Sequence, residues 1–169
     1  MLEALGNIGD FVGGVAVIVT LIYLAMQIRQ NTAALHAASR QEIASGFRDL
    51  NRFFLDPEVL EAYSKGLRKY PDMPFKQLGR FTTIITDHAL FLQGALALYE
   101  SGQLEKETFE AYLKFFACHI VTPGGAAWWE GIGRPFFVGG MVGVVDRRLA
   151  QGGLPDITQL PFLSPSDLV

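Results

Sequence analysis

The sequence is poor in charge and has almost no cysteine. Charged side chains make up 18% of its 169 residues, against about a quarter in an ordinary soluble domain. Its 14 lysines and arginines are outnumbered by 17 aspartates and glutamates, giving a net charge of -3, so we expect no basic patch for nucleic acid. The single cysteine, Cys118, excludes an intramolecular disulfide and a cysteine-rich zinc site, and suits a reducing compartment.

Catalytic signatures are missing as well. The sequence contains no H-E-x-x-H zinc motif, no G-x-S-x-G nucleophile motif, no Walker loop and no dinucleotide-binding G-x-G-x-x-G motif. It also has no internal repeat. We therefore expect no cofactor and favour a protein without catalytic activity.

The sequence is instead rich in apolar residues, which make up 50% of the chain. Residues 11–28, here called the apolar segment, lie between Asp10 and Arg29 without a formal charge. A helix of this length reaches about 27 Å, close to the thickness of the hydrocarbon core of a bilayer. The apolar segment predicts one transmembrane helix. A wholly buried core helix is the alternative, because this length is at the lower edge of the spanning range.

A cleaved secretory signal peptide is a competing interpretation of the apolar segment. It requires basic residues before the segment and a small-residue cleavage site after it. Residues 1–10 contain no lysine or arginine, so we expect an uncleaved membrane anchor over residues 1–31. Arg29, Arg40 and Arg48 follow the segment, and the positive-inside rule then places the N-terminus outside and the following domain in the cytoplasm.

Three glycines predict where a membrane helix would pack against another. Gly9 and Gly13 have the G-x-x-x-G spacing that lets two helix backbones approach closely in lipid, and Gly6 lies one turn earlier. Ordinary glycine usage in membrane helices explains the pattern equally well. We expect contacts here with copies of the chain or with other membrane-protein subunits.

Helical periodicity continues beyond the anchor and predicts an all-α fold, with a helical bundle over residues 32–151. No glycine or proline interrupts the chain from Val15 to Ser45, so we expect the first helix to continue past the membrane. Asp56 and Pro57 are typical of the start of a second helix. Two later helices, about residues 75–101 and 105–121, are separated by a few residues and should form an antiparallel hairpin.

The last part of the chain is expected to be less regular. It predicts a short helical turn bearing Trp128 and Trp129, a break at residues 131–135, and a glycine-rich helix to about residue 151. Residues 152–169, here called the tail, contain prolines and no helical or strand period, so we expect an extended arm.

Two histidines are the strongest candidates for a binding site. His88 and His119 fall on the apolar faces of the hairpin helices, and an antiparallel pairing would bring them level. With Asp87 or Glu100 nearby, they could hold a metal ion or relay a proton. Two core histidines bonded to each other or to hydroxyls explain the pattern more simply, because metal sites in bundles normally add carboxylates at i, i+3 spacing. Cys118 is discounted as a nucleophile because adjacent helical residues point about 100° apart.

An aromatic group follows the hairpin. Tryptophan pairs suit a membrane interface or a protein contact, where one ring edge stays wet. Closing the end of the helical core is the alternative on the same burial argument. The group consists of Trp128, Trp129, Phe136 and Phe137. Residues 135–145 are apolar and too short to span, but able to lie on a bilayer or pack against a neighbour.

Two runs of sequence carry a resemblance to a known family. Residues 21–32, LIYLAMQIRQNT, together with Pro123-Gly124-Gly125 and Trp128-Trp129-Glu130, resemble a family of bacterial membrane-anchored helical proteins whose activity is uncharacterised. The resemblance implies an N-terminal helix in the bacterial inner membrane and a helical domain, and it supplies no catalytic residue. Residues 139–143 and the tail depart from the family pattern.

The sequence thus predicts a membrane-anchored interaction protein, either a homo-oligomer or an accessory subunit of a larger membrane complex. Its expected partners are the lipid bilayer and copies of itself or other membrane-protein subunits, and not nucleic acid. The alternative is a metal- or ligand-binding helical bundle, or an enzyme, that uses His88 and His119.

Overall fold

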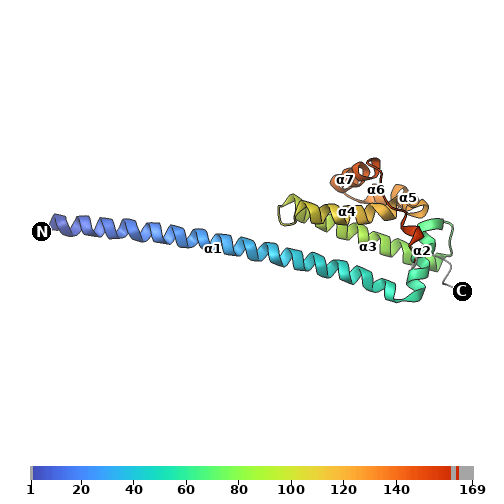
Figure 1. The fold of residues 1–169 in the computed structure, drawn as a ribbon, viewed down its shortest axis with the longest axis horizontal. Helices are drawn as coiled ribbons and strands as arrows, with labels where there is room; N and C mark the ends of the chain where they lie inside the picture. Colours follow the sequence, from blue (N-terminus) through green and yellow to red (C-terminus); the bar gives the residue numbers. More distant parts are fainter. Residues whose placement is uncertain (1, 161–162, 164–169) are drawn as a thin grey trace. The chain divides into compact units, whose positions relative to one another are not determined.

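The computed structural model describes residues 2–160 and 163, with side-chain surroundings from residue 11 onward (Figure 1). The described residues form helices and turns and no strand, which confirms the all-α class. The chain divides into two compact units, residues 1–39 and residues 40–169. The second is here called the helical unit. The boundaries expected after residues 31 and 151 stay predictions.

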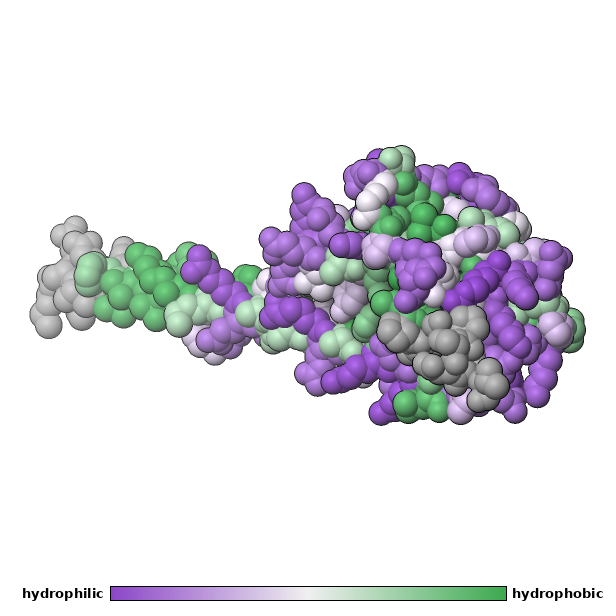
Figure 2. Space-filling view, turned by 45° about the vertical axis from the view of Figure 1, so that its right-hand side comes forward, coloured by the Kyte–Doolittle hydropathy of each residue, from purple (hydrophilic) through white to green (hydrophobic). Residues whose placement is uncertain are grey.

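Helix α1 runs without interruption from Leu2 to Arg52, as expected from the lack of breakers after Val15. From Phe11 it contains an 18-residue window that is long and apolar enough to cross a membrane, and none of that window is buried. Figure 2 shows an apolar surface on the visible side of this part of α1. By length and composition, this segment fits a membrane span or a signal sequence.

The helical unit begins with the end of α1, which buries Ile43 and Leu50. A short 3-10 turn over Phe53–Leu55 leads into helix α2, Pro57–Lys69. The carboxylate of Asp56 accepts a hydrogen bond from the backbone N–H of Glu58 at 2.9 Å. The predicted N-cap is therefore confirmed, with Pro57 at the first helical position, where its missing N–H costs nothing.

Helices α3 (Phe75–Glu100) and α4 (Lys106–Ile120) form the expected antiparallel hairpin (Figure 1). Gly102 makes the turn with a φ of 74°, in the left-handed region that favours glycine. The rings of Tyr99 and Phe109 stack across the hairpin, with centroids 4.8 Å apart. Helix α3 also has the length and composition of a membrane span, but 44% of its most apolar window is buried, which agrees with a core helix.

The expected break at residues 131–135 is wrong. Helix α5 (Pro123–Trp128) passes into a π-helical turn over Trp129–Gly133 and then into α6, Arg134–Phe136. Pro135 is tolerated because it lies in the first turn of α6, where no backbone N–H is needed. Helix α7, Gly139–Ala150, confirms the glycine-rich helix, and it packs against α4 (Figure 1).

Among the described residues of the tail, Ile157–Gln159 form a 3-10 turn, which sequence periodicity did not predict. Gly152 and Gly153 both have φ near +65° and redirect the chain at the end of α7. Arg68 then holds the tail: its Nη2 donates to the carbonyl oxygens of Thr158 at 2.6 Å and Leu163 at 2.8 Å. These two bonds attach the tail to α2 at Thr158 and Leu163.

The core of the helical unit is formed by α2, α3, α4, α5 and α7. Its largest fully buried side chains are Trp128, Trp129, Tyr63, Phe81, Phe116, Leu67, Ile85, Leu92, Ile120, Met141 and Val145. Three pairs of aromatic rings among them have centroids 5.7–6.3 Å apart: Tyr63 with Phe81, Phe116 with Trp129, and Trp128 with Trp129. Such tilted and edge-to-face contacts favour one arrangement of the core over others.

Glycines let α2 and α5 pack backbone against backbone. A Cβ atom on Gly124 would lie 1.8 Å from the carbonyl oxygen of Gly66, and one on Gly125 would lie 1.9 Å from that of His119. Thr122 is the N-cap of α5, because its Oγ1 accepts a hydrogen bond from the backbone N–H of Gly125 at 3.2 Å. The Pro123-Gly124-Gly125 run is therefore explained by packing and capping.

Candidate buried histidine site

The structure brings His88 of α3 and His119 of α4 side by side in the helical unit. Their ring centroids lie 5.6 Å apart, so the level pairing that the sequence predicted is confirmed. Both side chains are buried, at 4% and 6% exposure. The pair is a feature of the core, and any ligand must reach it through a cavity.

Each histidine is fixed by a backbone carbonyl of its own helix. His88 Nδ1 lies 2.7 Å from the oxygen of Ile84, and His119 Nδ1 lies 2.7 Å from that of Phe115. A carbonyl oxygen can only accept, so each Nδ1 carries the proton and donates it. In the neutral ring, Nε2 is then a free acceptor. The partners are thus neither the other histidine nor a hydroxyl, the partners expected from the sequence.

Burial keeps both histidines neutral. Desolvation, together with the nearby His88, lowers the pKa of His119 to about 3, against the smaller opposing effect of its hydrogen bond to Phe115. Desolvation also lowers the pKa of His88, against smaller opposing effects of its backbone hydrogen bond and of Asp87. A buried imidazolium would lose its hydration without a paired anion. The site therefore offers two neutral imidazoles at neutral pH.

Aromatic rings surround the pair, and Tyr63 of α2 is the residue that sequence reasoning missed. Its ring stacks on His88 with centroids 6.1 Å apart, and its centroid lies 5.8 Å from that of His119. Tyr63 is 1% exposed, and its hydroxyl has no hydrogen-bond partner among the described residues; the same holds for His88 Nε2. Its burial raises the pKa of the phenol, which stays protonated.

A cavity of about 110 Å³ lies next to Tyr63 and His119. Its polar lining consists of Asn51, Tyr63 and His119. Its apolar lining comes from Phe54 and Phe115 together with Ile157, Leu160 and Leu163 of the tail. No lining residue carries a formal charge.

A metal centre has little support. Among the described residues, no group of three or more histidine, cysteine, aspartate or glutamate side chains is placed to hold a metal ion. Glu100 lies exposed at the end of α3. Cys118 is buried, and burial raises the pKa of its thiol, so it is not activated as a nucleophile. Within the part of the chain that the structure describes, the pair has no third and fourth ligand of the kind that a zinc site requires.

The aromatic group divides between core and surface. Trp128 and Trp129 are 0% and 1% exposed, so they close the core rather than offer a contact surface. Trp129 Nε1 donates to Asp146 at 3.3 Å. Phe137 lies near Trp128, with centroids 6.3 Å apart, whereas Phe136 is 80% exposed. The predicted contact with another protein is therefore kept only for Phe136 and Phe137, and it stays a prediction.

Arg134 and the buried Trp129 share a hydrogen-bond acceptor, the carboxylate of Asp146. The guanidinium of Arg134 donates to Asp146 at 2.7 Å and to Glu130 at 3.0 Å. Asp146 thus accepts from both Arg134 and Trp129, which ties α6 and α7 to the π-helical turn. The i, i+4 spacing of Glu130 and Arg134 is a sequence signal that could have revealed half of this network.

The glycines expected to form a membrane contact lie outside the helical unit. A Cβ atom on Gly13 would meet nothing within 4 Å. Gly6 and Gly9 lie in α1, but their surroundings fall outside the described residues. The contact stays a prediction.

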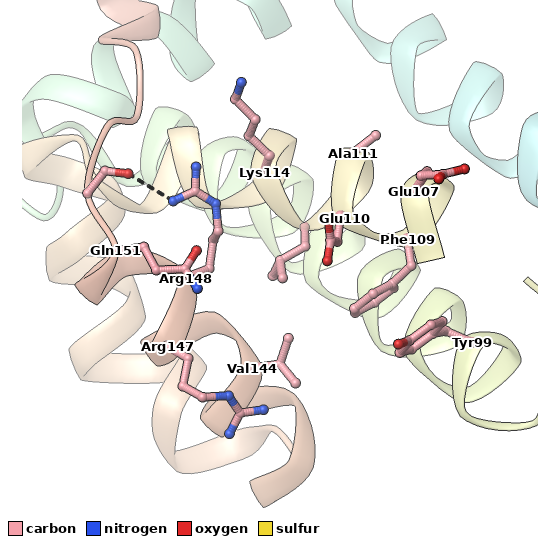
Figure 3. Close-up of a pocket in the computed structure, with 12 residues that line it drawn as sticks. Tyr99, Glu107, Phe109, Glu110, Ala111, Lys114, Val144, Arg147, Arg148 and Gln151 are labelled. Atoms are coloured by element: carbon pink, nitrogen blue, oxygen red, sulfur yellow. Dashed lines mark hydrogen bonds between the residues drawn. The ribbon is translucent and has the colours of Figure 1, made fainter. Parts of the chain in front are cut away.

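A second, larger cavity of about 620 Å³ lies among α3, α4 and α7 (Figure 3). It is lined by cations, including Lys114, Arg147 and Arg148, and by the carboxylates of Glu107 and Glu110. Arg148 donates to the carbonyl oxygen of Gly152 at 2.9 Å, and Arg147 and Lys114 point in different directions in Figure 3. The cations do not converge on one point, so we assign no anion site here.

Comparison of the chain with protein-family models, with curated proteins and with solved structures gives no match. The functional argument therefore depends on the chain's own residues.

Proposed function

We propose that this chain is a single-pass membrane protein that presents its helical unit at the membrane and works by assembly, as a homo-oligomer or as an accessory subunit of a larger membrane complex. The observation that carries the proposal is the exposure of the apolar segment. All of residues 11–28 are exposed within the chain. None of the apolar 18-residue window is buried.

The energetic argument for an apolar environment is strong. Burying one large apolar side chain stabilises a protein by about 1.5–3 kcal/mol, and a whole domain is stable by only about 5–15 kcal/mol. The exposed large apolar side chains of the segment are Phe11, Val12, Val15, Val17, Ile18, Val19, Leu21, Ile22, Tyr23, Leu24, Met26 and Ile28. Their burial is therefore worth more than the stability of a typical domain.

The distribution of these side chains favours lipid over another protein. A coiled coil buries one stripe of a helix and keeps charged residues on the rest, but the apolar segment has no charged residue on any face. Its polar groups are satisfied within the helix, as lipid requires. Thr20 donates to the carbonyl oxygen of Ala16 at 2.8 Å, and Gln27 donates to the hydroxyl of Tyr23 at 2.6 Å.

The orientation follows from the flanking charges. The first arginine, Arg29, comes directly after the apolar segment, and no lysine or arginine precedes it. Lysine and arginine resist translocation, so the helical unit lies in the cytoplasm. The assignment to the bacterial inner membrane and to the membrane-anchored family follows from the resemblance of residues 21–32.

The full-length protein is expected to sediment with membranes and to stay there after a high-salt wash. A charge at the centre of a membrane helix costs about 3 kcal/mol, so Ile18→Asp with Leu21→Asp should release most of the protein from the membrane fraction. Leu35→Asp, outside the apolar segment but equally exposed, is the matched control and should stay bound. Fractionation with immunoblotting measures this.

Two results would contradict the anchor. One is a wild-type protein that remains in the supernatant after lysis without detergent. The other is a membrane-processed chain whose intact mass falls below 18.6 kDa by the N-terminal segment, which would identify a cleaved signal sequence.

Assembly through the anchor gives a second expectation. Helices associate in lipid by close packing of small residues, so Gly13→Leu should weaken crosslinked oligomers in native membranes several-fold. Gly14→Leu is the matched control, because residue 14 lies about 100° around the helix from residue 13. A wild type that is strictly monomeric and has no crosslinked partner would end the assembly proposal.

A further inference from the structure

The cavity beside the histidine pair is lined by a buried hydroxyl that lacks a partner and by a histidine nitrogen that can accept a hydrogen bond. Tyr63 and His119 both line it. The hydroxyl of Tyr63 is buried and unpaired, and the hydrogen bond of His119 Nδ1 to Phe115 leaves Nε2 as the only other polar atom of that side chain. An unmade hydrogen bond of a buried group costs free energy. The unpaired hydroxyl of Tyr63 therefore favours an occupant that bonds to it, and His119 Nε2 offers such an occupant a second contact.

The two groups are complementary to a single hydroxyl. Tyr63 can donate its proton, and His119 Nε2 can only accept one while the ring is neutral. A bound hydroxyl group could accept from Tyr63 and donate to His119. The two side chains lie side by side, with ring centroids 5.8 Å apart, and both line the cavity, so one small molecule there can contact both.

The rest of the cavity selects for a small and uncharged molecule. Its walls are mainly apolar and include Phe54 and Phe115. An ion would lose its hydration there without a counter-charge. The volume of about 110 Å³ is somewhat smaller than the apolar cavity of about 150 Å³ that holds benzene in another protein. A compact hydroxylated molecule fits these limits.

The tail closes one wall of the cavity. Ile157 and Leu163 are buried and line it together with Leu160. Arg68 bonds the carbonyl oxygens of Thr158 and Leu163, so it holds this wall in place. Gly152 and Gly153, both in the left-handed region, join the wall to α7 and give the backbone freedom that other residues lack.

We propose that this cavity is a binding site for a small neutral hydroxylated molecule, a phenol or a compact alcohol, whose hydroxyl group bonds Tyr63 and His119 while the tail covers its apolar body. His88 does not line the cavity and supports the site by stacking on Tyr63. The site lies wholly within residues 40–169. It goes beyond the proposed function, and its test is independent of membrane partition.

Titration of the full-length protein with phenol tests the site. Detergent micelles also take up phenol, so the readout is the 15N chemical shift of the histidine side chains, of which the chain has 3. We expect a saturable change of the His119 Nε2 resonance with phenol and none with toluene, which has a similar shape but no hydroxyl. An unchanged resonance, or equal changes with both probes, would overturn the proposal and leave ordered water as the occupant.

Variants separate the hydroxyl contact from general packing. Tyr63→Phe keeps the ring and removes an unpaired buried group, so it should fold. It should weaken phenol binding about five- to tenfold, the value of one hydrogen bond. Tyr112→Phe is the matched control, because Tyr112 is half-buried in the same unit but does not line the cavity. Equal affinity of the two variants would contradict the assigned contact.

Arg68→Gln tests the wall formed by the tail. Loss of the two bonds to the tail carbonyls should weaken phenol binding about tenfold. Arg80→Gln is the control, because Arg80 bonds Glu58, whereas the carbonyls of Thr158 and Leu163 are bonded by Arg68. If Arg68→Gln binds phenol as tightly as the wild type does, the tail does not close the site.

Discussion

Lowering the pH from 7 to 5 is expected to reduce the free energy of unfolding of the helical unit by at least about 2 kcal/mol. The reason is the neutral His119. Its pKa is about 3 in the folded chain, against an ordinary value of 6.5. As the pH falls through 6.5, the unfolded chain binds a proton that the folded chain does not.

The sign follows from this difference in proton binding. Stability is fully present above the unfolded pKa of 6.5 and is lost as the pH falls towards the folded value of about 3. Over that window the loss is about 1.4 kcal/mol per pH unit for one histidine. Burial lowers the pKa of His88 as well, so His88 adds to the loss in the same direction.

Urea unfolding of the full-length protein in mild detergent at pH 7, 6 and 5 measures this effect. Trp128 and Trp129 are the only 2 tryptophans in the chain and both are buried in the helical unit, so their fluorescence reports its unfolding. His119→Gln should flatten the pH dependence, and His36→Gln, outside the cluster, should leave it unchanged. The explanation fails if His119→Gln and the wild type lose stability equally between pH 7 and pH 5.

Local signals in the sequence were enough to predict most of the helices. Asp56 and Pro57 mark the start of α2 because an N-cap and a proline act within one turn. Gly102 marks the hairpin turn for a similar reason. The register of His88 and His119 also followed, because two helices joined by a short turn must run antiparallel, so that counting back from the turn pairs their residues.

Signals that depend on tertiary packing were misread or missed. Gly131, Gly133 and Pro135 look like helix breakers, but the π-helical turn accommodates them. Gly133 is packed so closely that a Cβ atom there would lie 2.3 Å from the ring of Trp129. A residue's local preference is weaker than the burial of two tryptophans, so composition alone predicts a break where the structure has a helix.

The histidine pair could be predicted, but its cavity could not. Tyr63 comes from α2, and Ile157 and Leu163 come from the tail, 94 and 100 residues later in the chain. No periodicity relates these positions. Arg68 joins α2 to the tail, because its guanidinium donates hydrogen bonds to carbonyl oxygens of the tail. Backbone acceptors carry no sequence signal, so this contact is visible only in three dimensions.

Gly124→Ala is expected to destabilise the helical unit by about 3 kcal/mol. The added Cβ atom would lie 1.8 Å from the carbonyl oxygen of Gly66 and 2.9 Å from the carbonyl carbon of Leu67. Both are backbone atoms of α2, so no side chain can rotate away and the two helices must move apart. That movement would loosen the packing of α5, which carries the buried Trp128 at its end.

The matched control is Gly94→Ala in α3, where an added Cβ atom meets nothing within 4 Å. Alanine favours a helix over glycine by about 1 kcal/mol, so this variant should be unchanged or slightly more stable. Opposite shifts of the two urea midpoints, followed by tryptophan fluorescence, would show that close packing and not helix propensity decides position 124. If Gly124→Ala unfolds at the wild-type midpoint, α2 and α5 do not pack backbone against backbone, and the Pro123-Gly124-Gly125 run needs another explanation.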